Sequence, residues 1–483
     1  MIDTQAIRSK ILDLAMRGKL TEQLPEDGTA EELYRQIQSE KQSLIKAGKI
    51  KKEKPLPEIS EEERPFPIPT CWRWTYLGEL FQHNTGKALN SSDTHGKQLE
   101  YITTSNLYWN RFELDGLKTM PFSDSELEKC TVRRGDLLVC EGGDIGRAAI
   151  WTYDYEMRIQ NHIHRLRRYS ENIYPAFYYY LLWLYKQTGR INGIGIGLQG
   201  FSSKRVHSLI VPLAPYHEAV RLVEVIKKAF SALDTIDALQ AKYADNLAVL
   251  KSKLIDAAIQ GKLTEQLPED GTAEDLYRQI QAEKQALIKS GKIKKEKPLP
   301  EIDAECKECF DIPESWRWTS VGSVCINIQY GSSKKSSSSG KMAVLRMGNI
   351  QAGKIVYDDL VYTSDDDEIV KHPLEKDDLL FNRTNSMELV GKAAIYKGEM
   401  PAIYAGYLVR LTPLGIVSEY LNYVMQSKYY WDYCRTVRID SNGQSNINAE
   451  KLKRFVFPLP PLAEQKRIVA KLEALLPLCE RLK

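Results

Sequence analysis

The chain has 483 residues, enough for two to four domains, and 43% apolar with 27% charged residues is a globular composition. A net charge of +3, with 17 basic against 14 acidic residues in 67–215 and 18 against 16 in 313–461, excludes any inference of nucleic-acid binding from charge alone. Eight scattered cysteines and no apolar leader favour a reduced, cytoplasmic protein, and the apolar window Pro175–Tyr185 is too short to cross a membrane.

A long internal repeat sets the organisation of the chain. Residues 10–59 and 253–302 are identical at 41 of 50 positions. Weaker similarity follows, from IPTCWRW and IPESWRW to the segments LQGFSSKRVHSLIVPLAP and QSNINAEKLKRFVFPLPP. The sequence therefore predicts two units, each with a near-constant frame and a divergent body.

The first frame segment predicts a capped helix. Thr29 and Glu32 form a Thr-x-x-Glu capping box, and Gly48 ends the helix. In the second copy Thr272 faces Asp275, which is a weaker box. The basic run KAGKIKKEKP that follows is chemically able to contact phosphates or a partner protein, although a solvated face is the usual role of such a run.

A long helix is predicted between the bodies. Apolar residues recur at three- and four-residue steps, which predicts a coiled-coil-like helix from about Glu218 to Gln260, roughly 60 Å long at 1.5 Å per residue. By alignment Lys483 corresponds to Asp237 and Met1 to Ala244, so the terminal helices resemble a second, split copy. We therefore expect long antiparallel helices in a pseudo-two-fold cyclic repeat; the alternative is a tandem duplication with flexible ends.

Each body predicts a mixed domain of short strands and one or two helices, including Tyr174–Tyr185 and Ser418–Ser427. The fold class is therefore α+β, with two mixed α/β bodies separated by the long helices. The predicted segments are an N-terminal helical segment (1–66), the first body (67–215), a central helical spacer (216–312), the second body (313–461) and a C-terminal helix (462–483).

The loops of the bodies are polar and rich in Gly, Ser, Asn and Gln. Amide side chains such as those of Gln160, Asn161 and Asn349 suit adenine, and the forks of Arg346 and Arg383 suit guanine. Turn chemistry is the ordinary role of each such residue alone. Two similar frames with dissimilar loops nevertheless favour two DNA-reading domains on one duplex. One helical turn of DNA is about 34–36 Å, and a helix of roughly 60 Å can span that distance.

No catalytic motif is evident in the sequence. GSSKKSSSSGKM lacks the spacing of a phosphate-binding loop, and no Asp/Asn-Pro-Pro-Tyr/Phe methyltransferase segment occurs. GIGLQG (195–200) matches Gly-x-Gly-x-x-Gly outside a βαβ context. Cys306 and Cys309 form a lone pair, which is short of the four ligands of a structural zinc site. His162 and His164 alternate along a predicted strand and share a face, which favours a cross-strand pair or a DNA contact over a metal site.

Three sets of segments stand out in the two bodies: IPTCWRWTYLGEL and IPESWRWTSVGSV, RGDLLVCEGGDIGRAAI and KDDLLFNRTNSMELVGKAAI, and the final SNGQSNINAEKLKRFVFPLPPLAEQKRIV. In these segments the chain resembles the specificity subunits of type I restriction–modification systems. The first body departs from the pattern at Ala214–Glu218, where the family usually shows Pro-Pro-Leu-x-Glu-Gln.

The resemblance implies that each body is a target recognition domain reading half of a split double-stranded DNA site. It implies two methyltransferase subunits as partners, and restriction subunits bound through them. The chain itself would be non-catalytic and bind no cofactor, while its partners would use S-adenosylmethionine, ATP and magnesium.

Residues near the family's reading loops become the candidate DNA contacts, and only some should touch bases. They are Lys87, Asn90, Ser92, Thr104, Asn106, Asp144, Gln160, Asn161, His162, Gln199 and Lys204 in the first body, and Tyr330, Lys334, Lys335, Arg346, Asn349, Asn382, Arg383, Asn385, Gln444 and Asn446 in the second.

Two other classes of function stay open. A coiled-coil scaffold that binds proteins with its two bodies fits the same long helices and variable loops. A fragment of a fused restriction enzyme fits less well, because the catalytic residues are missing.

Overall fold

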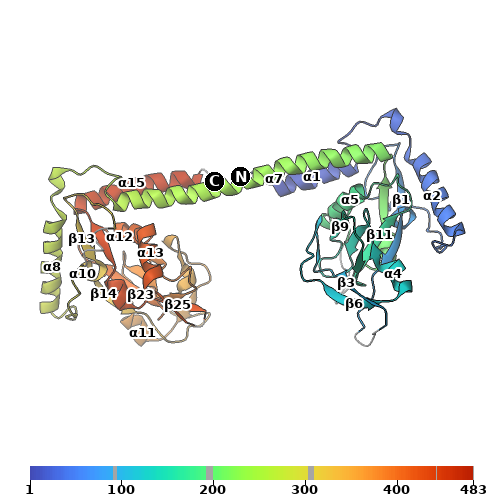
Figure 1. Ribbon diagram of the computed structural model, residues 1–483. Coiled ribbons are helices and arrows are strands. Elements are labelled where there is room, and N and C mark those ends of the chain that lie inside the picture. Colours follow the sequence, from blue (N-terminus) through green and yellow to red (C-terminus); the bar gives the residue numbers. More distant parts are fainter. Residues whose placement is uncertain (91–94, 192–199, 303–308, 442, 482–483) are drawn as a thin grey trace. The chain divides into compact units, whose positions relative to one another are not determined.

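The computed structural model of the protein describes residues 1–90, 95–191, 200–302, 309–441 and 443–481 (Figure 1). The candidates Ser92 and Gln199, Cys306 and most of GIGLQG lie outside these residues. The chain forms two compact units, Met1–Gln240 and Ala241–Lys483, each of mixed helix and strand as predicted.

The long helices of the first unit belong to its frame, with one exception inside the body. Its helices are α1 (Thr4–Met16), η1 (Pro25–Asp27), α2 (Ala30–Lys46), α3 (Leu77–Leu80), α4 (Asp124–Cys130), α5 (Pro175–Gln187), α6 (Ser203–His207) and the first part of α7 (Tyr216–Ile259). Its strands are β1 (Arg73–Tyr76), β2 (Phe81–Thr85), β3 (Lys97–Ile102), β4 (Leu107–Tyr108), β5 (Arg111–Phe112), β6 (Lys118–Phe122), β7 (Thr131–Val132), β8 (Leu137–Cys140), β9 (Ala148–Ile150), β10 (Met157–Ile159), β11 (Ile163–Arg168) and β12 (Ile210–Leu213).

Two four-stranded sheets make up most of the first body. Their strand orders are β6-β3-β10-β7 and β2-β11-β8-β9, and β10 pairs parallel to β3. A separate antiparallel pair of β1 and β12 joins the entry of the body to its exit, because Arg73 lies opposite Leu213 and Tyr76 opposite Ile210. The body is thus closed at its base before the chain enters α7.

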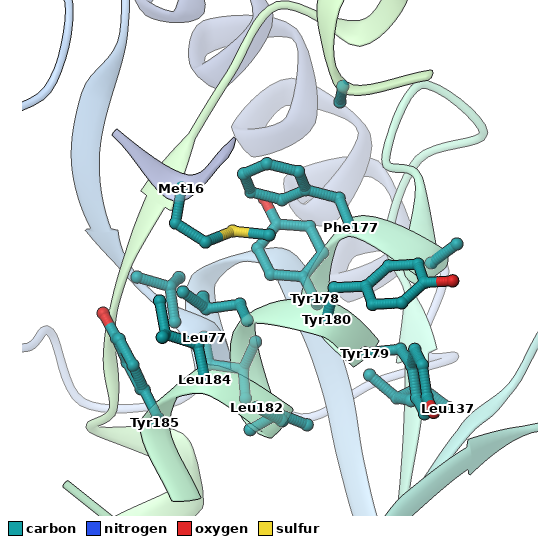
Figure 2. Close-up of a cluster of buried hydrophobic side chains, with 14 of the residues drawn as sticks. Met16, Leu77, Leu137, Phe177, Tyr178, Tyr179, Tyr180, Leu182, Leu184 and Tyr185 are labelled. Atoms are coloured by element: carbon teal, nitrogen blue, oxygen red, sulfur yellow. The ribbon is translucent and has the colours of Figure 1, made fainter. Parts of the chain in front are cut away.

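The core of the first unit is built around the aromatic helix α5 (Figure 2). Its side chains from Phe177 to Leu182 are buried and pack against frame and strand residues such as Met16, Leu77 and Leu137. Tyr178 contacts Phe81 edge to face, with ring centroids 5.1 Å apart. Aromatic burial of this kind provides a large hydrophobic contribution with fixed geometry.

The second unit repeats this plan with different strand lengths. Its helices are η2 (Pro268–Asp270), α8 (Ala273–Lys289), α10 (Val321–Val324), η3 (Met347–Asn349), α11 (Asp366–Lys371), α12 (Ser418–Val424), α13 (Lys428–Val437), α14 (Ala449–Lys453) and α15 (Leu462–Arg481). Its strands are β13 (Arg317–Ser320), β14 (Cys325–Tyr330), β15 (Met342–Leu345), β16 (Ile350–Gln351), β17 (Gly353–Ile355), β18 (Val361–Thr363), β19 (Leu379–Asn382), β20 (Thr384–Asn385), β21 (Ala393–Ile395), β22 (Ala402–Tyr404), β23 (Leu408–Pro413), β24 (Ile439–Ser441), β25 (Gln444–Asn446) and β26 (Val456–Leu459).

The sheets of the second body correspond to those of the first. The orders are β14-β23-β19-β21-β17-β16 and β18-β15-β22, with β13 and β26 closing the base as β1 and β12 do. An additional sheet, β20-β25-β24, has no counterpart among the described residues of the first unit. The helix predicted over Ser418–Ser427 is present as α12, which begins at Ser418 and ends at Val424, and the Ser427 hydroxyl accepts from the Tyr430 N–H to begin α13.

The long helices are confirmed as antiparallel pairs. In the first unit, α1 lies against α7, where Arg8 contacts Asp234 and Asp237 at 2.6 and 2.8 Å (Figure 1). In the second unit α15 lies against the later part of α7, and Lys251 contacts Glu480 at 3.0 Å. The observed bounds of α7 differ by two residues or fewer from the predicted Glu218–Gln260.

A buried carboxylate ties each frame to its body. Glu218 is fully buried and accepts from the Trp72 indole N–H at 2.8 Å and the Gln23 amide at 2.8 Å. Glu464 repeats these bonds in the second unit, at 2.7 Å from Trp316 and 2.8 Å from Gln266. The Trp-x-Trp segments and the distant glutamates are therefore one polar contact, made twice.

Glu218→Ala is expected to destabilise the first unit by roughly 2–4 kcal/mol, because the buried Trp72 indole N–H and the Gln23 amide lose a charged acceptor. Glu464→Ala should do the same to the second unit. Urea unfolding followed by tryptophan fluorescence measures both, with the exposed Glu61→Ala as control. Unfolding midpoints equal to that of the wild type would show that these bonds contribute no net stability.

In each unit, a lysine of the repeated segment also bonds to a backbone carbonyl of the body. The Lys41 ammonium donates to the Gly78 carbonyl at 3.1 Å, and that of Lys284 to the Gly322 carbonyl at 2.6 Å. Thr29 forms the predicted reciprocal capping box. The Thr272 hydroxyl accepts from the Asp275 N–H and donates to the Asp275 carboxylate, without the reciprocal backbone bond that completes the box at Thr29, as expected for the weaker box.

Candidate nucleic-acid interface

Three loops and the segment before α6 meet at one edge of the first body. They are joined through backbone groups of Lys87, Glu141 and Phe201 and of the β10–β11 loop. The bonds run from Lys87 N–H to Ile159 O (3.1 Å), Gln160 N–H to Ile102 O (3.0 Å), Asn161 N–H to Lys87 O (3.0 Å), Glu141 N–H to His162 O (2.9 Å) and Phe201 N–H to Glu141 O (2.8 Å). We call this set of bonds the edge lattice.

The second body contains the same lattice at corresponding positions. Its bonds run from Ser332 N–H to Tyr404 O (2.8 Å), Ala405 N–H to Leu345 O (3.0 Å), Gly406 N–H to Ser332 O (2.6 Å), Arg383 N–H to Tyr407 O (3.0 Å) and Ile447 N–H to Arg383 O (2.9 Å). The backbone of the edge is therefore common to the two bodies.

The side chains on this common backbone differ at every corresponding position. The pairs are Lys87 and Ser332, Gln160 and Ala405, Asn161 and Gly406, His162 and Tyr407, and Glu141 and Arg383. Charge, size and hydrogen-bonding type all change, while the backbone bonds stay within a few tenths of an ångström. Such an edge can display a new chemical pattern without a new fold.

One glycine at each edge has no room for a side chain. A Cβ on Gly86 would lie 2.0 Å from the Ile159 carbonyl oxygen, and one on Gly331 would lie 2.2 Å from the Tyr404 carbonyl oxygen. The N–H groups of these glycines donate to Ile163 and Leu408 at 3.4 and 3.3 Å. The two loops therefore approach their neighbours at backbone distance.

Four candidates of the first body lie on or beside the edge lattice. Gln160 and Asn161 are half-buried and His162 is exposed, whereas Lys87 is 8% exposed. The Lys87 ammonium donates to the Pro121 carbonyl at 2.8 Å and to Glu126 at 2.9 Å. Its side chain therefore supports the edge from inside the body, in contrast to its predicted role.

Asn106 and Asn349 have the same structural role in the two bodies. Asn106 Oδ1 accepts from the Thr103 N–H at 2.9 Å, and its amide donates to the Glu113 carbonyl at 3.0 Å. Asn349 Oδ1 accepts from the Arg346 N–H at 2.8 Å, and its amide donates to the Val356 carbonyl at 2.9 Å. These bonds occupy both amide groups, so the ordinary turn role applies to them.

The remaining candidates of the first body surround the edge. The Thr104 carbonyl accepts from Arg147 at 2.6 Å, and Asp144 pairs with Lys186 at 2.5 Å. Asn90 and Lys204 are exposed. The structure thus leaves polar groups of several kinds around the lattice.

In the second body, the candidates divide between an exposed group and a buried one. Arg383 lies over the Tyr330 ring, and Asn446 donates to the Thr384 hydroxyl at 2.8 Å beside Asn385. Asn382 is fully buried beneath them. Gln444, Lys334 and Lys335 are exposed, and Arg346 pairs with Asp359 at 2.8 Å.

The prediction that His162 and His164 share a strand face is wrong. β11 begins at Ile163, so His162 belongs to the preceding loop, while His164 is fully buried. The expected cross-strand pair instead joins His164 to His83, with their ring nitrogens 2.8 Å apart. His164 also contacts the Phe201 carbonyl at 2.5 Å, directly behind the edge lattice.

The buried histidine pair should make the first unit sensitive to acid. Burial lowers the pKa of His83 to about 3, with a further contribution from His164, and lowers the pKa of His164 to about 4. Unfolded histidines bind protons near pH 6.5 and the folded ones do not, so stability is full above that pH and is lost on acidification toward pH 4.

We expect the first unit to lose roughly 2–4 kcal/mol between pH 7 and pH 5. His83→Gln should reduce this loss by about half, since one imidazole no longer titrates. Urea unfolding at both pH values measures the effect, with the exposed His162→Gln as control. An equal pH dependence in His83→Gln and wild type would contradict the assignment.

Sequence reasoning missed Glu141, Arg147 and Tyr407. Glu141 was detectable, because DLLVCE and DLLFNR align it with Arg383. Tyr407 corresponds to His162 only through the backbone bonds, and no sequence signal identifies that match.

Neither a metal site nor a membrane segment is found in the described part of the chain. Over these residues, no three histidine, cysteine, aspartate or glutamate side chains are grouped to hold a metal ion. Over the same residues, no helix combines the length and apolar character needed to cross a bilayer.

Comparison with known proteins connects this architecture to one family. The family model for the type I restriction modification DNA specificity domain matches residues 69–245 and 313–482. The EcoAI specificity subunit of Escherichia coli is 29% identical, covering 99% of this chain and 90% of the relative. The EcoEI specificity subunit of Escherichia coli is 26% identical over the same shares.

A solved chain supports the fold. It comes from work on complex assembly and conformational transition of the type I R-M system, and it aligns with a TM-score of 0.56 at 18% identity, covering 87% of this chain and 93% of that one. Since the family model matches more than half of the sequence, the chain belongs to the DNA specificity subunit family of type I restriction–modification systems.

Proposed function

We propose that this chain is the DNA-recognition subunit of a type I restriction–modification complex and that it reads a bipartite site, one half with each body. The observation that carries the proposal is the edge lattice: one backbone pattern, present in both bodies, displays different side chains at every corresponding position. Base pairs differ in the donors and acceptors that they present in the major groove, so a changeable set of polar groups on a constant support suits their recognition.

The chain would direct chemistry that its partners perform. Two methyltransferase subunits would methylate adenine N6 with S-adenosylmethionine, and restriction subunits bound through them would use ATP and magnesium. The frame favours this division of roles, because the near-identical segments 10–59 and 253–302 are held to their bodies by the same buried contact in both units, which suits two equivalent partners. We place the assembly in the cytoplasm, where genomic DNA is accessible.

The proposal is tested by co-expressing the chain with its methyltransferase subunit and mapping N6-methyladenine by long-read sequencing. A motif of two short defined blocks around an unspecified gap supports it. Absent or contiguous methylation, with active methyltransferase bound to the chain, contradicts it and favours a protein-binding scaffold.

A further inference from the structure

Arg383 is held in the edge lattice of the second body through both of its backbone polar groups. Its N–H donates to the Tyr407 carbonyl at 3.0 Å, and its own carbonyl accepts from the Ile447 N–H at 2.9 Å. The chain is therefore fixed on both sides of this residue, between the start of β23 and the segment before α14. Because the main chain at Arg383 is already fixed, less conformational freedom has to be lost there on binding.

The Arg383 guanidinium is held against an exposed aromatic ring. Its central carbon lies 4.7 Å from the centroid of Tyr330, a residue that is 40% exposed. The Tyr330 hydroxyl accepts from the Ala449 N–H at 3.0 Å, which fixes the ring. Stacking of a planar guanidinium on such a face orients its donors along the ring plane and toward solvent.

Arg383 differs in its charge pairing from Arg346, Arg410 and Arg435 of the second body. Arg346 pairs with Asp359, Arg410 with Asp378 and Arg435 with Asp432. Within the part of the chain that the structure describes, the guanidinium of Arg383 has no carboxylate partner, and its buried Nε has no hydrogen-bond partner. Among the described residues the buried Nε of Arg346 and of Arg410 also has no partner, so the missing carboxylate is what distinguishes Arg383 from these two arginines.

The surroundings of Arg383 are polar and belong to the small sheet β20-β25-β24. Asn385 and Thr384 follow it directly, and Asn446 lies opposite Thr384 with its amide on the Thr384 hydroxyl. Gln444 is exposed on the same strand as Asn446. The guanidinium is thus one donor group within a patch of amides and hydroxyls.

We propose that Arg383, stacked on Tyr330, donates two hydrogen bonds to O6 and N7 of a guanine in the half-site read by the second body. The proposal rests on the proposed function and names a base for one of its side chains. Two parallel donors match the two acceptors that guanine presents in the major groove. The corresponding residue in the first body is Glu141, an acceptor, so the same lattice position reads a different base there.

A phosphate contact is the competing role for an arginine at a DNA interface, and lysine separates the two. An ammonium replaces a guanidinium on a phosphate as a point charge, but it does not reproduce the bidentate geometry. Arg383→Lys should therefore relax one guanine position if Arg383 reads the base. It should leave the motif unchanged if Arg383 contacts the backbone.

The experiment maps N6-methyladenine on a library of randomised sites, using the full complex with Arg383→Lys, Arg383→Gln or wild-type chain. We expect both variants to weaken the preference for guanine at one position of the second half-site by roughly 10–100-fold. The first half-site should be unchanged. Arg435→Gln, on the exposed face of α13, is the matched control and should leave both half-sites intact.

Tyr330→Leu removes the stacking face and leaves the arginine, so it should weaken the same position. It also tests the proposal if the Arg383 variants fail to assemble. A motif unchanged in Arg383→Lys and Tyr330→Leu overturns the assignment, as does relaxation spread evenly over both half-sites. A wild-type complex without a bipartite motif overturns the proposed function instead, so the two failures are distinct.

Discussion

Replacing residues 69–215 with a second copy of residues 313–461 is expected to give a complex whose methylation motif contains the second body's block twice. The first body's block should disappear. The physical reason is that the frame contacts of the two bodies are the same: a grafted Trp316 would meet Glu218 as Trp72 does, and a grafted Gly322 carbonyl would meet Lys41. The grafted body should therefore fold onto the first frame.

The expected loss at the original sites is large. Each mismatched base pair costs roughly 1–3 kcal/mol, so a half-site that differs at several positions lowers occupancy by more than about 1,000-fold. Long-read mapping of N6-methyladenine measures it. The control replaces 69–215 with an identical, recoded copy and should keep the wild-type motif. Persistence of the first block in the chimera would show that the body does not read it.

The frame could be predicted from the sequence because its signals are local and periodic. The three- and four-residue apolar steps defined α7 to within two residues, and Thr29 with Glu32 identified a capping box that is present. Some of the apolar residues that recur along this helix are nevertheless exposed: Tyr243 and Leu250 are each 42% accessible. Periodicity shows which residues share a helix face, but not how far a partner helix covers it.

The candidate site could be predicted only as a region. Asn349 is a candidate base reader from its amide chemistry and Asn106 from the family resemblance, yet their amides bond to carbonyls seven residues further along. Lys87 is similar, because Glu126, which neutralises it, lies on the separate helix α4. Partners that come from another turn or another element leave no trace in a polar loop sequence.

Glu141 is not among the predicted DNA contacts, although it aligns with the predicted contact Arg383. The loops after β8 and β19 differ in length, so the alignment loses register a few residues later. DLLVCE and DLLFNR align Glu141 with Arg383, and the matching backbone bonds to Phe201 and Ile447 show that the two residues occupy one position of the edge. The common edge is a property of the main chain, which sequence comparison of divergent loops cannot detect.

Gly86→Ala should sharply reduce methylation of the wild-type site through the first half-site alone. The new Cβ would lie 2.0 Å from the Ile159 carbonyl oxygen and 2.4 Å from the Gln160 carbonyl carbon, far inside van der Waals contact. Because both neighbours are backbone, the loop must move, and the lattice bonds that Lys87 makes with Ile159 and Asn161 break. Overpacking of this kind costs roughly 1–3 kcal/mol.

Displacement of the edge should also move Gln160 and Asn161, which are candidate DNA contacts, so we expect roughly a 100-fold loss of site occupancy. Gly331→Ala should act equally on the second half-site, since its Cβ would lie 2.2 Å from the Tyr404 carbonyl oxygen. Gly142→Ala, whose Cβ meets nothing within 4 Å, is the control. Methylation mapping measures site recognition by each variant, and thermal unfolding measures its stability. A Gly86→Ala complex with wild-type stability and motif would show that the close approach of these loops is not what positions the reading side chains.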